Sequence, residues 1–262
     1  MTSHSSVVSG LNAGTTYHYR INSRDAAGNL ATSSDLTFAT PVPVDTTPPS
    51  TTIPSIGIDT SVVVKQASAG STMTAPTFST AEPNELLVAF IATDGSTDFR
   101  MINTVTGGGL TWTLRQQANS QRGTSEIWTA TAPTAMADVS VTATHSGTYQ
   151  GLMQIVAFTN ADIGATGGAS AESGAPTTGI STTAANSWVW AVGNDWDSAA
   201  ARTVGSSQTK ASEMLADVGD TFWVQHRADR SVGAGQKVNI DDVSPTNDRW
   251  NLAVVEIVAG LA

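Results

Sequence analysis

Cysteine is absent from the 262 residues of this chain, so neither disulfide bonds nor thiolate metal sites can form. This absence excludes zinc fingers and cysteine nucleophiles. Charged residues make up only 13% of the sequence, and long apolar runs are missing. The longest run, LLVAFIA at 86–92, is far shorter than the roughly 20 residues that a transmembrane helix needs. We therefore expect no membrane span.

Basic residues are also scarce. The chain has 12 Lys and Arg and 22 Asp and Glu, which gives a formal net charge of −10. The few cations are scattered, so no basic stripe can neutralise a phosphate backbone, and nucleic acid is not an expected partner. The N-terminus lacks the charged and apolar regions of a signal peptide. If the protein is exported, we expect its signal to lie upstream of this sequence.

The chain does contain short apolar segments separated by Ser, Thr, Gly and Ala, which is typical of β-rich extracellular modules. No stretch has a convincing amphipathic helical pattern. The predicted fold is all-β, an antiparallel two-sheet β-sandwich of jelly-roll-like form over residues 62–262. Its predicted strands are 62–67, 85–93, 110–117, 125–131, 138–144, 152–159, 187–193, 221–228, 237–240 and 249–259.

Two of these segments, 85–93 and 152–159, are apolar on both faces, which predicts a central position in a sheet. The last segment, 249–259, is expected in the core beside one of them. In 110–117, Leu110, Trp112 and Leu114 alternate with polar residues, so one face of that strand should be packed and the other exposed to solvent.

Residues 9–40, SGLNAGTTYHYRINSRDAAGNLATSSDLTFAT, resemble the second half of a fibronectin type III domain. Leu11 and Tyr17 match the tyrosine corner of that family, in which the phenol bonds back to an upstream backbone group. The resemblance implies a partial domain over residues 1–40, followed by a Pro/Thr-rich linker over 41–61. The apolar face of such a fragment needs a cover, and self-association through it is one expectation.

Residues 62–259 resemble a domain that recurs in bacterial secreted and cell-surface proteins, often after fibronectin repeats. The shared features are the segments NELLVAFIATDG, GGGLTWTL, SEIWTATAP, IVAFTNAD and WNLAVVEI. This resemblance implies a β-sandwich fold and an extracellular or cell-surface location. It implies no activity, and no catalytic residue is carried over from it.

Candidate binding residues gather around Trp196, which follows a predicted strand end and is flanked by two carboxylates and an amide. An exposed indole can stack on a sugar ring while its polar neighbours bind the hydroxyls. The alternative is that the two aspartates cap a turn and that Trp196 packs under a loop. If the loops converge, the predicted ligand-binding set is Asn194, Asp195, Trp196, Asp197, Trp223, His226 and Arg227.

Several carboxylates could form a calcium site, because Ca²⁺ is bound by about 6 to 8 oxygens in flexible geometry. No EF-hand loop is present, and no other cofactor is expected. The candidate calcium ligands are Asp94, Asp98, Asp195, Asp197, Asp241 and Asp242.

Catalytic candidates are fewer. His226 could act with Asp195 or Asp197 as its orienting carboxylate, or Asp195 and Glu126 could form an acid–base pair. The sequence contains no G-x-S-x-G, H-E-x-x-H or phosphate-loop motif.

Three functions remain open from the sequence. The leading hypothesis is a non-catalytic module that binds polysaccharide or cell-wall glycan within a larger secreted protein. The second is an extracellular hydrolase that acts on a polysaccharide or an ester through His226 or the carboxylates. The third is a passive spacer without a ligand.

Overall fold

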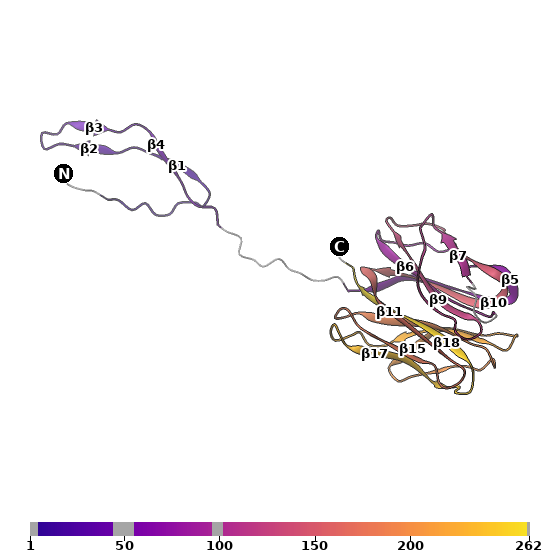
Figure 1. The fold of residues 1–262 in the computed structure, drawn as a ribbon. Coiled ribbons are helices and arrows are strands. Elements are labelled where there is room, and N and C mark those ends of the chain that lie inside the picture. Colours follow the sequence, from indigo (N-terminus) through magenta and orange to yellow (C-terminus); the bar gives the residue numbers. More distant parts are fainter. Residues whose placement is uncertain (1–4, 44–54, 96–101, 261–262) are drawn as a thin grey trace. The chain divides into compact units, whose positions relative to one another are not determined.

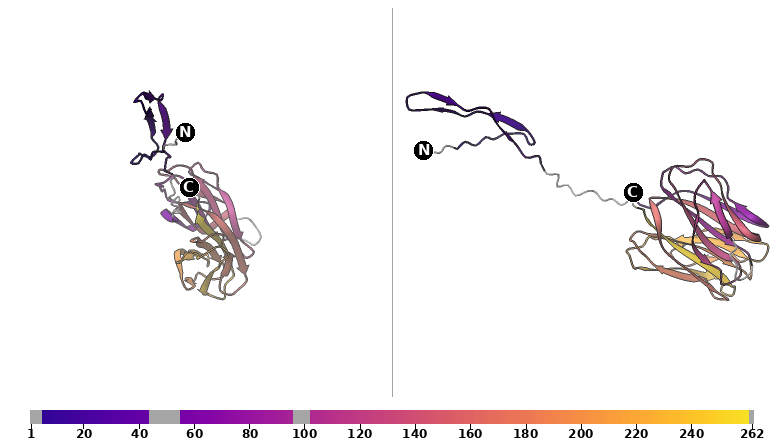
Figure 2. Two further views of the ribbon diagram at one scale, coloured as in Figure 1. Left: turned by 90° about the vertical axis from the view of Figure 1, so that its left-hand side faces the viewer. Right: turned by 45° about the horizontal axis from the view of Figure 1, so that its top comes forward.

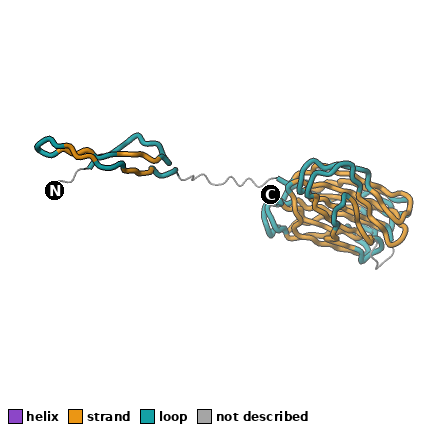
Figure 3. The backbone as a smooth tube through the Cα atoms, turned by 90° about the horizontal axis from the view of Figure 1, so that it is seen from above, coloured by secondary structure: helices purple, strands orange, loops and turns teal. Residues whose placement is uncertain are grey.

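The computed structural model describes residues 5–43, 55–95 and 102–260, and the chain divides into two compact units, Met1–Thr52 and Ile53–Ala262 (Figure 1). Every regular element within these ranges is a strand, as Figure 3 shows, and the all-β prediction is confirmed. The described residues accordingly contain no helix that is long and apolar enough to cross a bilayer. Most of the predicted linker lies outside the described residues.

Unit 1, the segment Met1–Thr52, consists of two short antiparallel strand pairs. The backbone N–H of Asn12 donates a hydrogen bond of 2.8 Å to the Tyr17 phenol, which is the contact that the tyrosine-corner pattern predicts. Tyr17 stacks on Phe38 with ring centroids 5.8 Å apart, while Tyr19, Leu36 and Phe38 are exposed. The pairs are β1 (Thr16–Tyr19) with β4 (Leu36–Ala39) and β2 (Asn22–Arg24) with β3 (Leu30–Thr32).

Unit 2, the segment Ile53–Ala262, contains two main antiparallel sheets that pack face to face (Figures 1 and 2). The first main sheet has the strand order β5-β10-β6-β9-β8, and the second has the order β11-β18-β13-β16-β15. The strands of the first are β5 (Gly57–Thr74), β6 (Glu85–Thr93), β8 (Thr113–Ala118), β9 (Thr124–Ala132) and β10 (Val141–Thr159). Those of the second are β11 (Ala161–Ala171), β13 (Trp188–Asp195), β15 (Gln208–Leu215), β16 (Thr221–Arg227) and β18 (Trp250–Ala259).

Each main sheet is covered on its other face by an outer layer. The second sheet is covered by the small sheet β12-β17-β14, formed by Thr177–Ser181, Lys237–Ser244 and Thr203–Val204. The first is covered by β7 (Ile102–Gly107) together with the distal parts of the long strands β5 and β10. β10 pairs with β7 before residue 146 and with β6 after residue 150, with shifts in its register to β5 between Thr144 and Gly151.

The two halves of unit 2, β5–β10 and β11–β18, repeat one topology. Asn84 precedes β6 and Asn186 precedes β13, and both adopt a left-handed backbone with φ of 59° and 58°. The pairs β8/β9 and β15/β16 each contain a register shift at the same place, after Leu114 and after Lys210. The registers of these strand pairs align the residues of the first half with those of the second. Each half consists of one main sheet and its outer layer.

The interface between the halves is the largest hydrophobic cluster. Phe90 of the first half stacks on Trp190 of the second with ring centroids 5.5 Å apart, and Phe158 meets Trp190 edge-on at the same distance. Face-to-face packing of aromatic and aliphatic side chains buries a large apolar area and stabilises the pair of sheets. Further buried members are Val88, Ile127, Leu152, Val156, Val192, Phe222, Val224, Val255 and Ile257.

Gly193 permits close packing of a tryptophan on the second sheet. It pairs with Trp223, and a Cβ added at Gly193 would overlap the Trp223 indole, which is completely buried. We expect Gly193→Ala to lower the free energy of unfolding by about 1–3 kcal/mol, because the indole must move within a packed core. Chemical denaturation measures this loss. Gly233→Ala is the matched control, since a Cβ there meets no atom within 4 Å; equal stability of the two variants would contradict the expectation.

The strand predictions were right for most large apolar segments and wrong elsewhere. β6 and β10 are central in their sheet, as predicted, but β18 lies in the opposite sheet, between β11 and β13. Segments 138–144 and 152–159 belong to one strand, β10, and β5 begins at Gly57, within the predicted linker. The strands that were not predicted are β7, β11, β12, β14 and β15.

Candidate functional site

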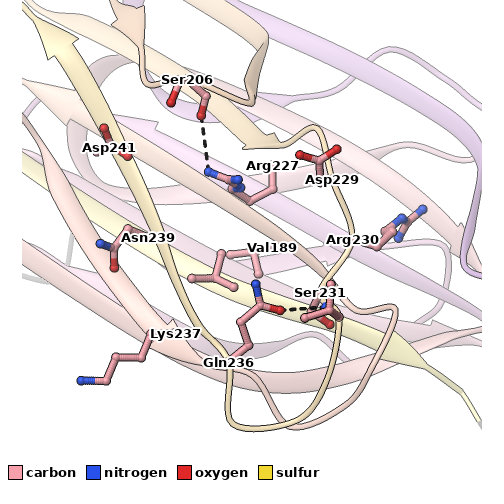
Figure 4. A pocket seen from close by; sticks show the side chains of 12 residues that line it. Val189, Ser206, Arg227, Asp229, Arg230, Ser231, Gln236, Lys237, Asn239 and Asp241 are labelled. Atoms are coloured by element: carbon pink, nitrogen blue, oxygen red, sulfur yellow. Dashed lines mark hydrogen bonds between the residues drawn. The ribbon is translucent and has the colours of Figure 1, made fainter.

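A polar pocket of about 410 Å³ opens where β16 leads through residues 228–236 into β17 (Figure 4). We call it the β16–β17 pocket. Val189 lies in the middle of the view, with Arg227, Gln236 and Asn239 around it. The lining residues are Val189, Ser206, Arg227, Asp229, Arg230, Ser231, Val232, Gln236, Lys237, Val238, Asn239 and Asp241.

Hydrogen bonds hold the loop that forms one wall of this pocket. The Gln236 amide oxygen accepts the Val232 N–H at 2.7 Å, and the Ser231 hydroxyl donates to the Ala184 carbonyl at 2.8 Å. The Thr182 hydroxyl accepts the Gln236 N–H at 3.1 Å. Because both ends of the loop are bonded to residues 182–184, the pocket is formed before any ligand arrives, as in most small-molecule sites.

The pocket carries three cations and two carboxylates. The Arg227 guanidinium donates one long hydrogen bond of 3.4 Å to the Ser206 carbonyl, which Figure 4 marks. The Arg230 guanidinium lies 3.8 Å from the centre of the Trp188 ring, and burial lowers its pKa. Asp241 accepts a 2.8 Å hydrogen bond from the Gln208 amide.

Among the described residues of the first half, apolar side chains occupy the place that is equivalent to this pocket. The aligned registers put Trp112 at the position of Gln208 and Ala130 at the position of Arg227. Trp112 and Ala130 belong to a closed hydrophobic cluster that also contains Leu87, the counterpart of the pocket residue Val189. One copy of the fold therefore fills this space with apolar side chains, whereas in the other Arg227 lines the pocket and Gln208 bonds the pocket residue Asp241.

The predicted sugar platform around Trp196 is not open. Trp196 is half-buried, and the Arg122 guanidinium covers its ring at 4.9 Å from the centroid. Asp197 accepts hydrogen bonds from the Arg249 backbone N–H and guanidinium, and these bonds lower its pKa. Asn194 is completely buried between the sheets, with its side chain bonded to the Arg122 carbonyl. The alternative is met only in part: Trp196 is packed and Asp197 is bonded to Arg249, but Asp195 caps no turn and is a strand residue that is bonded to Arg202.

The predicted set does not converge on one site. Asp195 pairs with Thr221 and Trp190 pairs with His226, five residues further along the same two strands, a separation of about 17 Å. His226 packs on Trp190 with ring centroids 4.3 Å apart, and burial lowers its pKa. His226 and Asp195 or Asp197 are therefore not a catalytic pair.

Trp223 is completely buried, and its indole N–H donates to Gln225. Of the seven predicted ligand-binding residues, Arg227 is the one that lines the β16–β17 pocket.

Asp195 and Glu126 lie in different layers. Glu126 is buried against the outer layer of the first half, where it accepts hydrogen bonds from Gln117 and from the Trp128 indole, and burial raises its pKa. Asp195 faces the outer layer of the second half, where it is bonded to Arg202. Because packed sheets are about 10 Å apart and both carboxylates point away from the shared interface, they cannot form an acid–base pair.

The candidate calcium ligands are also dispersed. Asp195 and Asp242 lie beside Arg202, Asp197 is paired with Arg249, and Asp241 is bonded to Gln208. Burial raises the pKa of Asp94, and Asp98 lies outside the described residues. Within the ranges that the structure describes, no group of three or more His, Cys, Asp or Glu could hold a metal ion.

These observations define an all-β protein of several antiparallel sheets, with the β16–β17 pocket in the second of its two repeated halves. No protein-family model, curated protein or solved structure matches the chain.

Proposed function

We propose that unit 2 is a non-catalytic carbohydrate-binding module and that the β16–β17 pocket holds one sugar unit of a polysaccharide. The observation that supports this proposal is the difference between the two halves. The second half has Gln208 where the first has the core residue Trp112. Loss of a buried aromatic side chain typically costs about 3–5 kcal/mol of stability. We therefore take the polar residue at position 208 to serve a purpose other than packing.

The chemistry of the pocket suits a sugar. Asn239 and Gln236 can both donate and accept hydrogen bonds, Asp229 and Asp241 accept them, and Arg227 donates them, which matches the mixed demands of sugar hydroxyls. Val232, which also lines the pocket and is 86% exposed, offers an apolar surface for the C–H groups of a ring. The volume lies within the range of about 300–1,000 Å³ that is usual for small-ligand sites.

The proposed setting is a multi-modular protein outside the bacterial cell, with unit 2 as a jelly-roll-like β-sandwich. It is supported by the likeness of residues 9–40 to the second half of a fibronectin type III domain and of 62–259 to a bacterial secreted module. The hydrogen bond between Asn12 and Tyr17 agrees with the first likeness. Self-association through the exposed face of unit 1 stays a prediction. A hydrolase gains no support, since its candidate residues lie apart.

Arg227→Ala should weaken binding to insoluble or immobilised polysaccharides by about 10- to 100-fold, because one or two charge-assisted hydrogen bonds are lost. Retention in a pull-down, quantified as a binding isotherm, measures this effect. Arg115→Ala is the matched control, since Arg115 is an exposed arginine on β8 of the first half. Unchanged retention of the Arg227 variant would contradict the site, and absence of binding by the unaltered chain would favour a spacer.

A further inference from the structure

Within the second half of unit 2, the cations that have no carboxylate partner all line the β16–β17 pocket. Elsewhere in the second half, Arg202, Lys210 and Arg249 each form an ion pair with a carboxylate, whereas Lys65, Arg115 and Arg122 in the described part of the first half lie outside the pocket without one. The three pocket cations, Arg227, Arg230 and Lys237, form no ion pair among the described residues, although Asp229 and Asp241 line the same pocket. In a chain of net charge −10, this arrangement brings three unpaired cations together around one pocket.

Arg227 is the pocket cation best placed to bind an anion. Its side chain is half-buried, it lies nearer the middle of the pocket view than Arg230 or Lys237, and its one hydrogen bond, to the Ser206 carbonyl, is 3.4 Å long (Figure 4). A guanidinium carries five N–H donors in a planar fork, and that fork matches the two oxygens of a carboxylate. With one long hydrogen bond and no carboxylate partner, the Arg227 guanidinium keeps several N–H donors that an anion can use.

The two pocket carboxylates, Asp229 and Asp241, do not cancel the positive charge of the pocket. Asp241 is bonded to Gln208 on the neighbouring strand β15, and Asp229 is exposed at the pocket rim. The lining carries three cations against two carboxylates, a balance of +1. The overall acidity of the protein acts at longer range, and it is screened over about 8 Å at physiological salt, whereas a direct guanidinium contact is screened much less.

We infer, on the basis of the proposed function, that the sugar selected by the pocket bears a carboxylate, as a hexuronic acid unit does. The carboxylate binds the Arg227 guanidinium through two parallel hydrogen bonds. The ring hydroxyls bind Asn239, Gln236 and the free oxygen of Asp241, and the apolar side of the ring lies toward Val232. A neutral sugar of the same shape leaves the guanidinium unpaired.

The test uses oligosaccharides in matched pairs, namely oligogalacturonate, oligoguluronate and oligoglucuronate, each beside its methyl ester, which keeps the hydroxyls and loses the charge. Calorimetric titration of the whole chain should show at least about tenfold tighter binding of one or more acids than of their esters. Arg227→Gln should abolish that preference, and Arg227→Lys should lose most of it, because the ammonium lacks the planar fork. Arg115→Gln should behave as the unaltered chain.

The outcomes separate the inference from the proposed function. If the chain binds neutral glycans or the esters as tightly as the acids and Arg227→Gln weakens both equally, the pocket binds sugar and the carboxylate preference is wrong. If Arg227→Gln still binds the acids more tightly than their esters, the inference is also overturned, because residues other than Arg227 then recognise the carboxylate. If neither these ligands nor any polysaccharide in the pull-down is retained, the proposed function is wrong as well.

Discussion

Arg202→Met should lower the free energy of unfolding of unit 2 by about 3–5 kcal/mol. The Arg202 side chain is completely buried, forms an ion pair with the equally buried Asp195, and lies 4.6 Å from the centre of the Trp223 ring. Asp195 also accepts the Thr221 N–H, so it cannot turn away toward solvent. Removal of the guanidinium therefore leaves a carboxylate inside the protein without its counter-ion.

Two further variants check the origin of this loss by urea denaturation. The double variant Asp195→Asn with Arg202→Met should regain part of the stability, because Asp195 then carries no buried charge, although Asp242, the second carboxylate beside Arg202, remains. Arg249→Met removes a partly exposed ion pair with Asp197 and should cost less than about 1 kcal/mol. A double variant no more stable than Arg202→Met alone would show that the buried charge of Asp195 does not determine the effect.

The stability of unit 2 should fall as the pH rises from about 5 to 8. Asp220 is 1% exposed, and its burial, with smaller effects of Asp94 and Asp197, raises its pKa to about 8. Burial likewise raises the pKa of Glu85 to about 7. Both folded-state pKa values lie above the unfolded ones, so the folded protein binds more protons in this window. Each group then removes up to about 1.4 kcal/mol of stability per pH unit.

Asp220→Asn isolates the larger of these contributions. The amide has the same shape and does not titrate, so the variant should show a flatter profile of unfolding free energy against pH and should exceed the unaltered chain in stability at pH 8. Asp217→Asn, an exposed position in the same turn, serves as the control. Parallel profiles for Asp220→Asn and the unaltered chain would contradict the assignment.

Strands rich in large apolar residues could be predicted from the sequence, whereas β11 could not. β6 matches its predicted range because every side chain in it is buried and most are large. The sequence of β11, ADIGATGGASA, has few large side chains and low intrinsic strand propensity. β11 has small side chains because it is closely packed against its neighbours. A Cβ on Gly168 would lie 2.8 Å from the Gln116 amide, and a Cβ on Gly167 would lie 3.0 Å from Ile180. Tertiary contacts, which no local pattern reveals, decide this strand.

The candidate site was predictable only in part. Arg227 was selected from the sequence, but Asn239 and Gln236 lie in a polar stretch without any distinguishing pattern. Trp196 failed as a platform because the group that covers it, Arg122, is 74 positions upstream. The alignment of NELLVAFIATD at 84–94 with NSWVWAVGNDW at 186–196 is the signal that could have revealed the repeat.

Because the two similar halves belong to one polypeptide, they can differ in sequence and in role, which the subunits of a symmetric homodimer cannot. In a homodimer, every mutation is mirrored in the partner, so exchange of a core tryptophan for glutamine would weaken both subunits at once. Here Trp112 persists in one copy while Gln208 occupies the other. Laboratory evolution of new ligand preferences should therefore diversify the surroundings of Gln208 and Arg227 and leave the first copy as an unaltered support.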